Sequence, residues 1–166
     1  MKNKNKDIKK LAKSFKFAFN GFFYCIKRER NMRIHISAIL PVIFILTIVD
    51  TDIYSLLFIL SAIFFVIFAE MINTAIENIV AKISRSYDFL CKISKDIAAG
   101  AVLISAIYAI CVALVIFVFS GKWQKILLFI YSNPVWWIII LLYIILAVLF
   151  IFYPSFKQNK SKIKEH

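Results

Sequence analysis

Glycine, proline, cysteine and histidine are all scarce in this chain of 166 residues, which has three glycines, three prolines, three cysteines and two histidines. The glycines stand at positions 21, 100 and 121, so the phosphate-binding pattern GxxxxGK[ST] cannot be written anywhere and a site of that type is excluded. Cys25, Cys91 and Cys111 are too few and too scattered for a disulfide framework. His35 and His166 have no metal-ligand partners at suitable spacing, and we expect neither to be catalytic.

Apolar residues, in contrast, are abundant, at 62% of the chain. A soluble core of this size could not bury them, so a bilayer must cover the surplus. Apolar runs near 34–49, 53–69, 97–119 and 135–153 are each about long enough to cross the hydrocarbon layer, which predicts four spanning helices. The second could run from Ile53 to Lys82, about 45 Å against a hydrocarbon layer of roughly 30 Å, so its end should emerge from the membrane.

The net charge is +12, and most of the basic residues flank the apolar runs. This distribution is typical of a membrane protein and not of a basic surface that binds nucleic acid. Lysines and arginines crowd into the first 33 residues, the loop 82–96 and the tail, whereas the turn between the first two runs holds Asp50 and Asp52. Basic residues gather on the cytosolic side of a membrane. We therefore expect a multi-pass protein of the bacterial inner membrane with both termini cytosolic. The charged start lacks an early apolar core, so no cleavable signal peptide is expected.

The segment 8–26 has apolar residues at helical spacing, with lysines mainly on the opposite side. It is typical of an interfacial amphipathic helix whose lysines contact anionic headgroups, although a simple docking helix remains the alternative. Residues 123–131 either lie in the outer interface or begin the fourth span, and Asn133 with Pro134 marks a helix start. The predicted fold is an all-α membrane protein with an N-terminal surface helix (1–28), three core transmembrane helices (29–121), one additional transmembrane helix (122–156) and a basic cytosolic tail (157–166).

Polar residues interrupt the second apolar run at Glu70, Asn73 and Glu77. At about 100° per residue they lie within roughly 60° on one helix face. Ionisable groups in lipid are costly, so this stripe indicates either a functional site or a packed polar interface. Glu70 should lie near the inner edge of the hydrocarbon, at the depth of a lipid hydroxyl, and Glu77 about 10 Å further toward the cytosol, where nucleotide phosphates could reach.

Glu29 precedes the first span and should lie near the depth of Glu77, so that two carboxylates could hold magnesium bridging phosphates. The alternative is that Glu29 merely pairs with neighbouring basic residues. Lys95 and Asp96, where the third span begins on the cytosolic side, offer a phosphate partner and a further carboxylate, although Lys95 could equally be a charge that sets topology.

Three stretches of the sequence resemble the small prokaryotic diacylglycerol kinase family, which includes the undecaprenol kinases of Gram-positive bacteria. They are AFNG at 18–21 followed by ERN at 29–31, EMINTAIENIV at 70–80, which is similar to the family pattern ExxN[ST]AIExxVD, and SKDIAAGAV at 94–102, which is similar to AKDxxxAAV. The order and spacing agree over residues 10–120, and the central motif is quite specific.

The resemblance implies a surface helix with three membrane helices, a homotrimer with sites shared between subunits, and ATP with magnesium. By position, Glu70 would be the general base on the lipid hydroxyl and Asn73 a positioning group. Glu29 and Glu77 would be magnesium ligands and Lys95 a phosphate contact. Two departures are Ala81, where the family has aspartate, and residues 122–166, which add a span. The lipid alcohol could be undecaprenol or diacylglycerol, and the Gram-positive members favour undecaprenol slightly.

Two other functions compete with a lipid kinase. One is a membrane scaffold or small ion-conducting assembly, but a pore stripe should continue across the bilayer. Here the outer half of that face holds mostly Ile, Phe and Leu. The other is a degenerate family member that binds lipid without turnover, which Ala81 favours.

Overall fold

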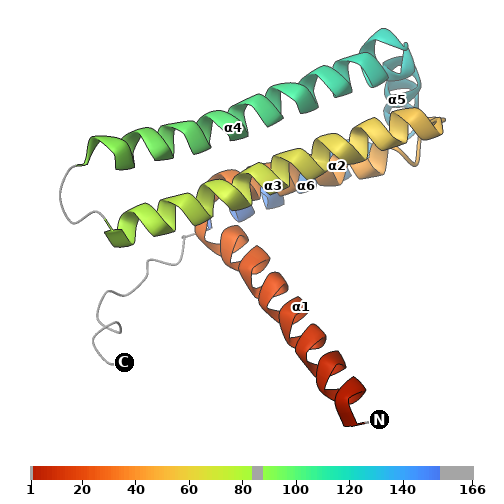
Figure 1. The fold of residues 1–166 in the computed structure, drawn as a ribbon. Coiled ribbons are helices and arrows are strands. Elements are labelled where there is room, and N and C mark those ends of the chain that lie inside the picture. The colour runs from red at the N-terminus through yellow and green to blue at the C-terminus, as the bar shows by residue number, and fades with distance from the viewer. Residues whose placement is uncertain (1, 84–87, 154–166) are drawn as a thin grey trace.

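The computed structural model describes residues 2–83 and 88–153, and within these ranges the chain is helical and contains no strand (Figure 1). This confirms the predicted all-α fold class. The helices, in chain order, are α1 (Lys2–Arg28), α2 (Arg30–Ile45), α3 (Ile53–Ile83), α4 (Phe89–Ala113) with its π-helical continuation η1 (Leu114–Phe119), α5 (Lys122–Tyr131) and α6 (Val135–Ile151).

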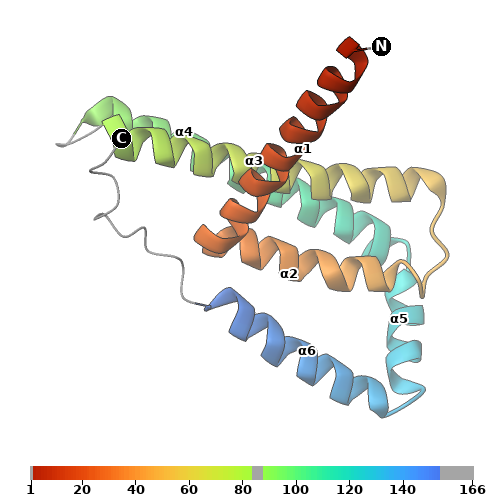
Figure 2. The same cartoon turned by 90° about the horizontal axis from the view of Figure 1, so that it is seen from below.

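Four of the helices run alongside one another, and two do not. Helices α3 and α4 form the most extensively packed pair, with α2 against α3 and α6 against α2 (Figures 1 and 2). Arg33, near the start of α2, donates from Nε to the carbonyl of Ile151 at 3.2 Å, so the start of α2 and the end of α6 share one end of the bundle. Helix α5 crosses the opposite end, and α1 projects away from the bundle (Figure 2).

The core is a narrow stripe along α3, facing α2 and α4. Its buried members recur every three or four residues, as one face of an α-helix requires. The matching face of α4 carries the small residues Ala98, Val102 and Ser105, which allow the two helices to lie close together. The stripe on α3 consists of Ile59, Ala62, Val66, Glu70, Asn73 and Thr74. Two of the predicted site residues therefore continue the line of the apolar core.

The helices differ in whether they are long enough to cross a bilayer. Helix α3 and the continuous segment Phe89–Phe119 each have 31 residues and pass on length and apolar composition. The pair α5 and α6 passes only when taken together, with a bend of 105° between them. Helix α2 has 16 residues and ends at Ile45, short of the predicted boundary at 49. The described residues thus contain two candidate spans, or three with the bent pair, against the four expected.

Residues 122–134 form a separate element and not the beginning of a straight fourth span. Gly121 has a φ of +75°, a conformation in which side chains with a Cβ are strained, and it ends η1 before α5 begins. Lys125 on α5 pairs with Asp50 at 2.6 Å. The Asn133 side chain accepts a hydrogen bond from the backbone N–H of Val135 at 2.9 Å, and a helix starts here as predicted, with Pro134 as the N-cap and Val135 as the first helical residue.

Helix α4 begins earlier than the sequence pattern predicts. Asp88 caps it by accepting a hydrogen bond from the Cys91 backbone N–H at 2.9 Å, and the helix runs from Phe89. Residues 89–96, predicted as loop, are therefore helical, because the Asp88 cap starts the helix and lysine is a good helix former, although Lys92 and Lys95 lower the hydropathy of this stretch. Pro154 and the basic tail 157–166 lie outside the described residues.

Helix α1 makes contact with the bundle only near its C-terminal end. From residue 6 to Gly21 every side chain is exposed, including the apolar ones. Ile8, Leu11, Phe15 and Phe19 are each 57–60% exposed. A docking helix would cover these side chains against the bundle. Within one chain they are uncovered, as the interfacial interpretation requires.

Candidate active site

Glu70 is the most deeply buried carboxylate of the structure's described part. Its side chain is 1% exposed, on the core face of α3 between Val66 and Thr74. Neither carboxylate oxygen has a hydrogen-bond partner. A buried polar atom without a partner is costly, and such a group in a native protein calls for a functional explanation.

One side chain nevertheless approaches this carboxylate. His35 on α2 places Nε2 3.2 Å from Oε1 of Glu70. The separation lies within hydrogen-bonding range, but the angular criteria of a hydrogen bond are not met, so the contact is an approach and not a formed bond. His35 itself is 20% exposed.

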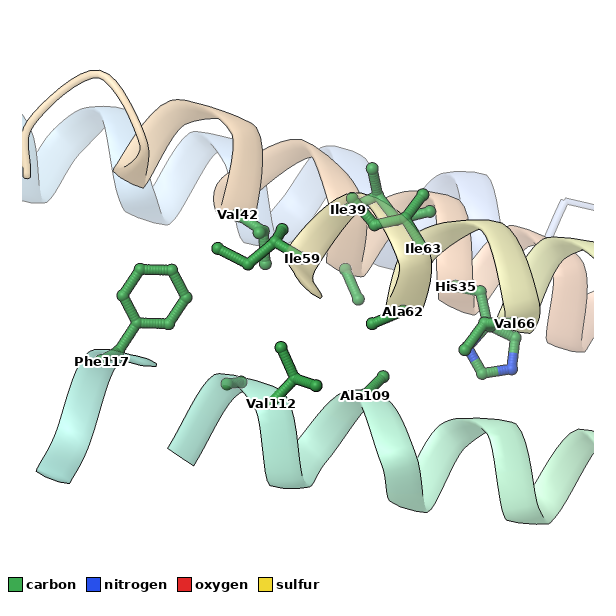
Figure 3. A pocket seen from close by; sticks show the side chains of 12 residues that line it. His35, Ile39, Val42, Ile59, Ala62, Ile63, Val66, Ala109, Val112 and Phe117 are labelled. Carbon is green, nitrogen blue, oxygen red and sulfur yellow. The ribbon is translucent and has the colours of Figure 1, made fainter. Parts of the chain in front are cut away.

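An apolar cavity of about 120 Å³ lies between α2, α3 and α4, and His35 stands at one end of it (Figure 3). Phe117 stands at the other end, and every lining residue except His35 is apolar. The imidazole is therefore the polar end of an otherwise apolar space, next to the buried carboxylate.

Asn73 and Glu77 continue the stripe along α3. Asn73 is 7% exposed and donates from Nδ2 to Oε1 of Glu77 over 3.5 Å, a long contact, while its Oδ1 has no partner. Glu70 and Asn73 both lie on the buried face of α3, and the Asn73 side chain contacts Glu77. The three residues therefore share one face of the helix, as predicted.

Glu29 is the single non-helical residue between α1 and α2, and it is the N-cap of α2. Its Oε1 is 3.3 Å from Nε of Arg28, which agrees with the interpretation of a local ion pair. Burial raises the pKa of Glu29, the charge of Glu77 raises it further, and Arg28 opposes both. Glu77 on α3 is therefore near enough to Glu29, at the junction of α1 and α2, to affect its pKa.

Arg28 accounts for this proximity. Its Nη1 donates to the Tyr24 hydroxyl at 2.6 Å and to Oδ1 of Asn78, the residue after Glu77. These bonds join the end of α1 to α3. They hold the junction that carries Glu29 beside the turn of α3 that carries Glu77.

Lys95 and Asp96 are both exposed on the second turn of α4. Among the described residues, neither makes an ion pair with Glu29, Glu70 or Glu77. Lys95 precedes the buried Ala98 and Val102 by three and seven residues, so it lies within about 60° of the face that α4 turns to α3. The structure thus places Lys95 beside the stripe without bringing it into contact.

On sequence alone His35 is set aside, and Arg33 is only one of the basic residues near the N-terminus. His35 is the one titratable residue in the run 34–49, a signal that could have identified it. Arg33 is 3% exposed and also donates from Nη1 to the carbonyls of Ile26 and Lys27, at 3.1 and 3.2 Å. It therefore ties the ends of α1 and α6 to α2. No group of three or more His, Cys, Asp or Glu side chains within the described ranges could hold a metal alone.

Residues 16–117 match the family model described as prokaryotic diacylglycerol kinase. The chain is 36% identical over 103 residues to a diacylglycerol kinase of Synechocystis, a match that covers 61% of this chain and 59% of that protein. It is 32% identical over 116 residues to the undecaprenol kinase of Bacillus subtilis, covering 70% of this chain and 94% of that protein.

A diacylglycerol kinase of Escherichia coli is 27% identical over 110 residues, covering 66% of this chain and 90% of that protein. No solved structure gives a significant match. The names of these relatives agree with the predicted class of enzyme, a lipid kinase, and the family together with the apolar helices indicates a bacterial membrane protein. By its motifs and these matches, the chain belongs to the prokaryotic diacylglycerol kinase family.

Proposed function

We propose that this protein transfers the γ-phosphoryl group of ATP to the hydroxyl of a membrane lipid alcohol, undecaprenol or diacylglycerol, at the cytosolic face of the membrane. The observation that carries the proposal is Glu70. It is a carboxylate with two unpaired oxygens, buried among apolar helices close to a second pair of carboxylates. A group that must accept a proton from a lipid requires such a position.

In the proposed reaction, Glu70 accepts the proton of the lipid hydroxyl while the hydroxyl oxygen forms a bond to the γ-phosphorus. The bond from that phosphorus to the bridging oxygen breaks, and ADP leaves. Asn73, one turn along the stripe, has an unpaired Oδ1 and a weakly engaged Nδ2, so it can orient the reacting groups. Because phosphoryl transfer requires mainly positioning and charge stabilisation, these few side chains suffice.

Glu29 and Glu77 are the side chains that would hold magnesium with the nucleotide. Carboxylates are ligands that Mg²⁺ prefers, and it commonly binds one or two of them together with substrate phosphates and water. Burial and then the charge of Glu77 raise the pKa of Glu29, and a cation held between the two carboxylates would offset that repulsion. When bound, the ion neutralises charge on the phosphates. Lys95 and Asp96 are exposed near the start of α4. We assign Lys95 to a phosphate of the nucleotide.

The decisive experiment incubates the purified protein in lipid with labelled ATP and magnesium, offering undecaprenol and diacylglycerol in parallel. Label in either lipid establishes the reaction and identifies the substrate. The undecaprenol kinase of Bacillus subtilis is matched over most of its length, and this favours undecaprenol. If folded protein in native lipid labels neither alcohol, the kinase proposal is wrong and a scaffold becomes the better interpretation.

We further propose a homotrimer with both termini in the cytosol. Helices α3 and α4 expose large apolar side chains along most of their length, among them Leu60, Phe64, Phe68 and Ile104. In a membrane these surfaces are covered by lipid or by other copies of the chain. Cross-linking in native membranes would distinguish a trimer from a monomer.

Ala81 predicts a weak nucleotide site. It is exposed on α3 four residues after Glu77, so a carboxylate there would lie on the same face about one turn further along. We expect Ala81→Asp to lower the apparent ATP requirement roughly tenfold, the effect of one added hydrogen bond of about 1.4 kcal/mol. The lipid requirement should change little.

Ala81→Asn is the matched control, because asparagine has the shape of aspartate without its charge. Steady-state kinetics at varied ATP measures both variants. An unchanged ATP dependence in well-folded Ala81→Asp would refute the prediction. Activity that appears only on introducing aspartate would identify the natural protein as a degenerate kinase.

Residues 122–166 are predicted to be accessory to the chemistry. The family match ends at residue 117, and α6 touches the core mainly through α2, where the Tyr143 hydroxyl donates to the Ser37 carbonyl and Ile151 accepts from Arg33. We expect a truncation after Gly121 to lose less than about tenfold in rate, below ~1.4 kcal/mol in the barrier. Its thermal stability should fall, because Arg33 loses a buried acceptor.

The truncated protein is compared with the full chain in the same lipid, by phosphate transfer and by thermal unfolding. A truncated protein that inserts and assembles but transfers no phosphate would show that the additional helix helps to form the site.

A further inference from the structure

His35 is the basic side chain that lies within ion-pair distance of Glu70 in the described part of the chain. It comes from a different helix, α2, and bridges to the core stripe of α3 at 3.2 Å between Nε2 and Oε1. Both residues are largely enclosed, at 20% and 1% exposure, so water cannot readily take the place of the imidazole. The contact is built by the packing of two helices and not by chain neighbours.

His35 differs from the other titratable groups near Glu70 because it can donate a strong hydrogen bond to the carboxylate. Cys25 on α1 is buried, and this burial, with smaller contributions from the charges of Glu29 and Glu70, raises its pKa. Glu29 at the start of α2 is likewise affected by Glu70. A thiol, which is a weak donor, and a second carboxylate cannot hold an oxygen of Glu70 in place. An imidazole N–H can, by hydrogen bonding to one oxygen.

The cavity also shows that His35 is the polar group next to Glu70 on this side of α3. His35 forms its polar end, and the remaining lining is apolar from there to Phe117 (Figure 3). If an N–H of His35 engages Oε1, then Oε2 is the oxygen left to accept a proton. A separation of 3.2 Å without a formed hydrogen bond agrees with a contact that tightens when substrates bind.

We propose that His35 is a positioning residue of the kinase site, which holds Oε1 of Glu70 through Nε2 so that Oε2 faces the lipid hydroxyl. This inference rests on the proposed function. His35 acts through Glu70 and needs no contact with the lipid or the nucleotide.

Two substitutions separate positioning from packing. His35→Leu fills a similar volume and removes the donor, whereas His35→Gln retains an N–H donor. We expect His35→Leu to lower kcat roughly 10- to 100-fold, with KM for magnesium-ATP unchanged, because it removes the donor whose hydrogen bond to Glu70 we propose to form when substrates bind. His35→Gln should recover most of the rate. His166→Leu, which removes the other histidine of the chain, is the control and should retain the parental rate.

The coupling to Glu70 is tested by combining variants. On a Glu70→Gln background, His35→Leu should cost little more, because residues that act as a unit are not additive. Parental kcat in His35→Leu, equal losses in the Leu and Gln variants, or a full additional loss on the Glu70→Gln background would each overturn the inference. A purely structural role would instead lower thermal stability and raise KM for ATP in parallel.

A spectroscopic measurement keeps this inference distinct from the proposed function. With two histidines in the chain, the imidazole nitrogen signals of protein labelled with ¹⁵N are assigned by His35→Leu. Glu70→Gln should shift the His35 signal and leave that of His166 unmoved. If the parental protein labels no lipid alcohol, the kinase proposal fails, whereas an unmoved His35 signal refutes the contact whether or not the protein is active.

Discussion

Replacing Glu70 by glutamine is expected to lower phosphoryl transfer by roughly 10²- to 10⁴-fold, the usual contribution of a positioned acid or base. Glutamine has nearly the same shape but cannot accept the proton of the lipid hydroxyl. The apparent affinity for ATP should persist, because the proposed nucleotide ligands Glu29 and Glu77 are untouched. Rates at saturating ATP and lipid, with KM for each, provide the measurement.

The same substitution should leave the protein at least as stable as its parent. A carboxylate whose two buried oxygens have no hydrogen-bond partner opposes folding, and a neutral amide removes the charge. A variant that is inactive yet melts at the parental temperature or above would show that Glu70 is retained for function, as sites that trade stability for activity are.

Asp50→Asn is the matched control for Glu70→Gln. Asp50 is an exposed carboxylate in the turn before α3, paired with Lys125 at the end of the bundle away from Glu70. Its replacement should change the rate little, because an exposed pair contributes little to stability. Parental turnover in Glu70→Gln would show that Glu70 is not the base.

The local geometry of the site could be predicted from sequence, because helical periodicity fixes which residues share a face. The spacing of Glu70 and Asn73 placed them on one side of α3, and the structure puts both on the stripe that begins at Ile59. The exceptional length of α3 was predictable for the same reason: an uninterrupted apolar run with few helix breakers continues as one helix.

Contacts between helices could not be predicted in this way. His35 lies 35 positions from Glu70, and nothing in the local pattern of either segment indicates that α2 packs with that residue toward α3. Arg33 similarly contacts the end of α6, 118 positions away. In the sequence, Arg33 looks like a charge that sets membrane topology and His35 like an isolated polar residue. Their partners are known only once the packing of the helices is known.

Helix ends were the least predictable features. The Asp88 cap starts α4 well before its apolar run, and α2 ends at Ile45 although the apolar run continues to 49. The bend of 105° between α5 and α6 depends on the short connection at Asn133 and Pro134. Hydropathy averages over such local signals, so it indicates that a span exists better than where it begins.

Glu29→Gln and Glu77→Gln should each reduce the use of magnesium-ATP on the order of 10²-fold, and the double variant should be only slightly worse than either. The reason is that both carboxylates are proposed to hold one ion, so removing the first already disorders it. Independent contributions would instead multiply to roughly 10⁴-fold. Titrating Mg²⁺ at fixed ATP for the four proteins completes the cycle, with Asp7→Asn, an exposed carboxylate on α1, as the control.

The competing explanation is that Glu29 serves only as the partner of Arg28. At 21% and 29% side-chain exposure, and with 3.3 Å between Nε and Oε1, that pair is open to solvent. Such a pair contributes about 0.2–1 kcal/mol, a loss of less than about fivefold. Small, independent effects of Glu29→Gln and Glu77→Gln would therefore favour the ion pair. Large and non-additive effects would not, because a solvent-open pair with Arg28 contributes too little to account for them, whereas one cation held by both carboxylates would couple them directly.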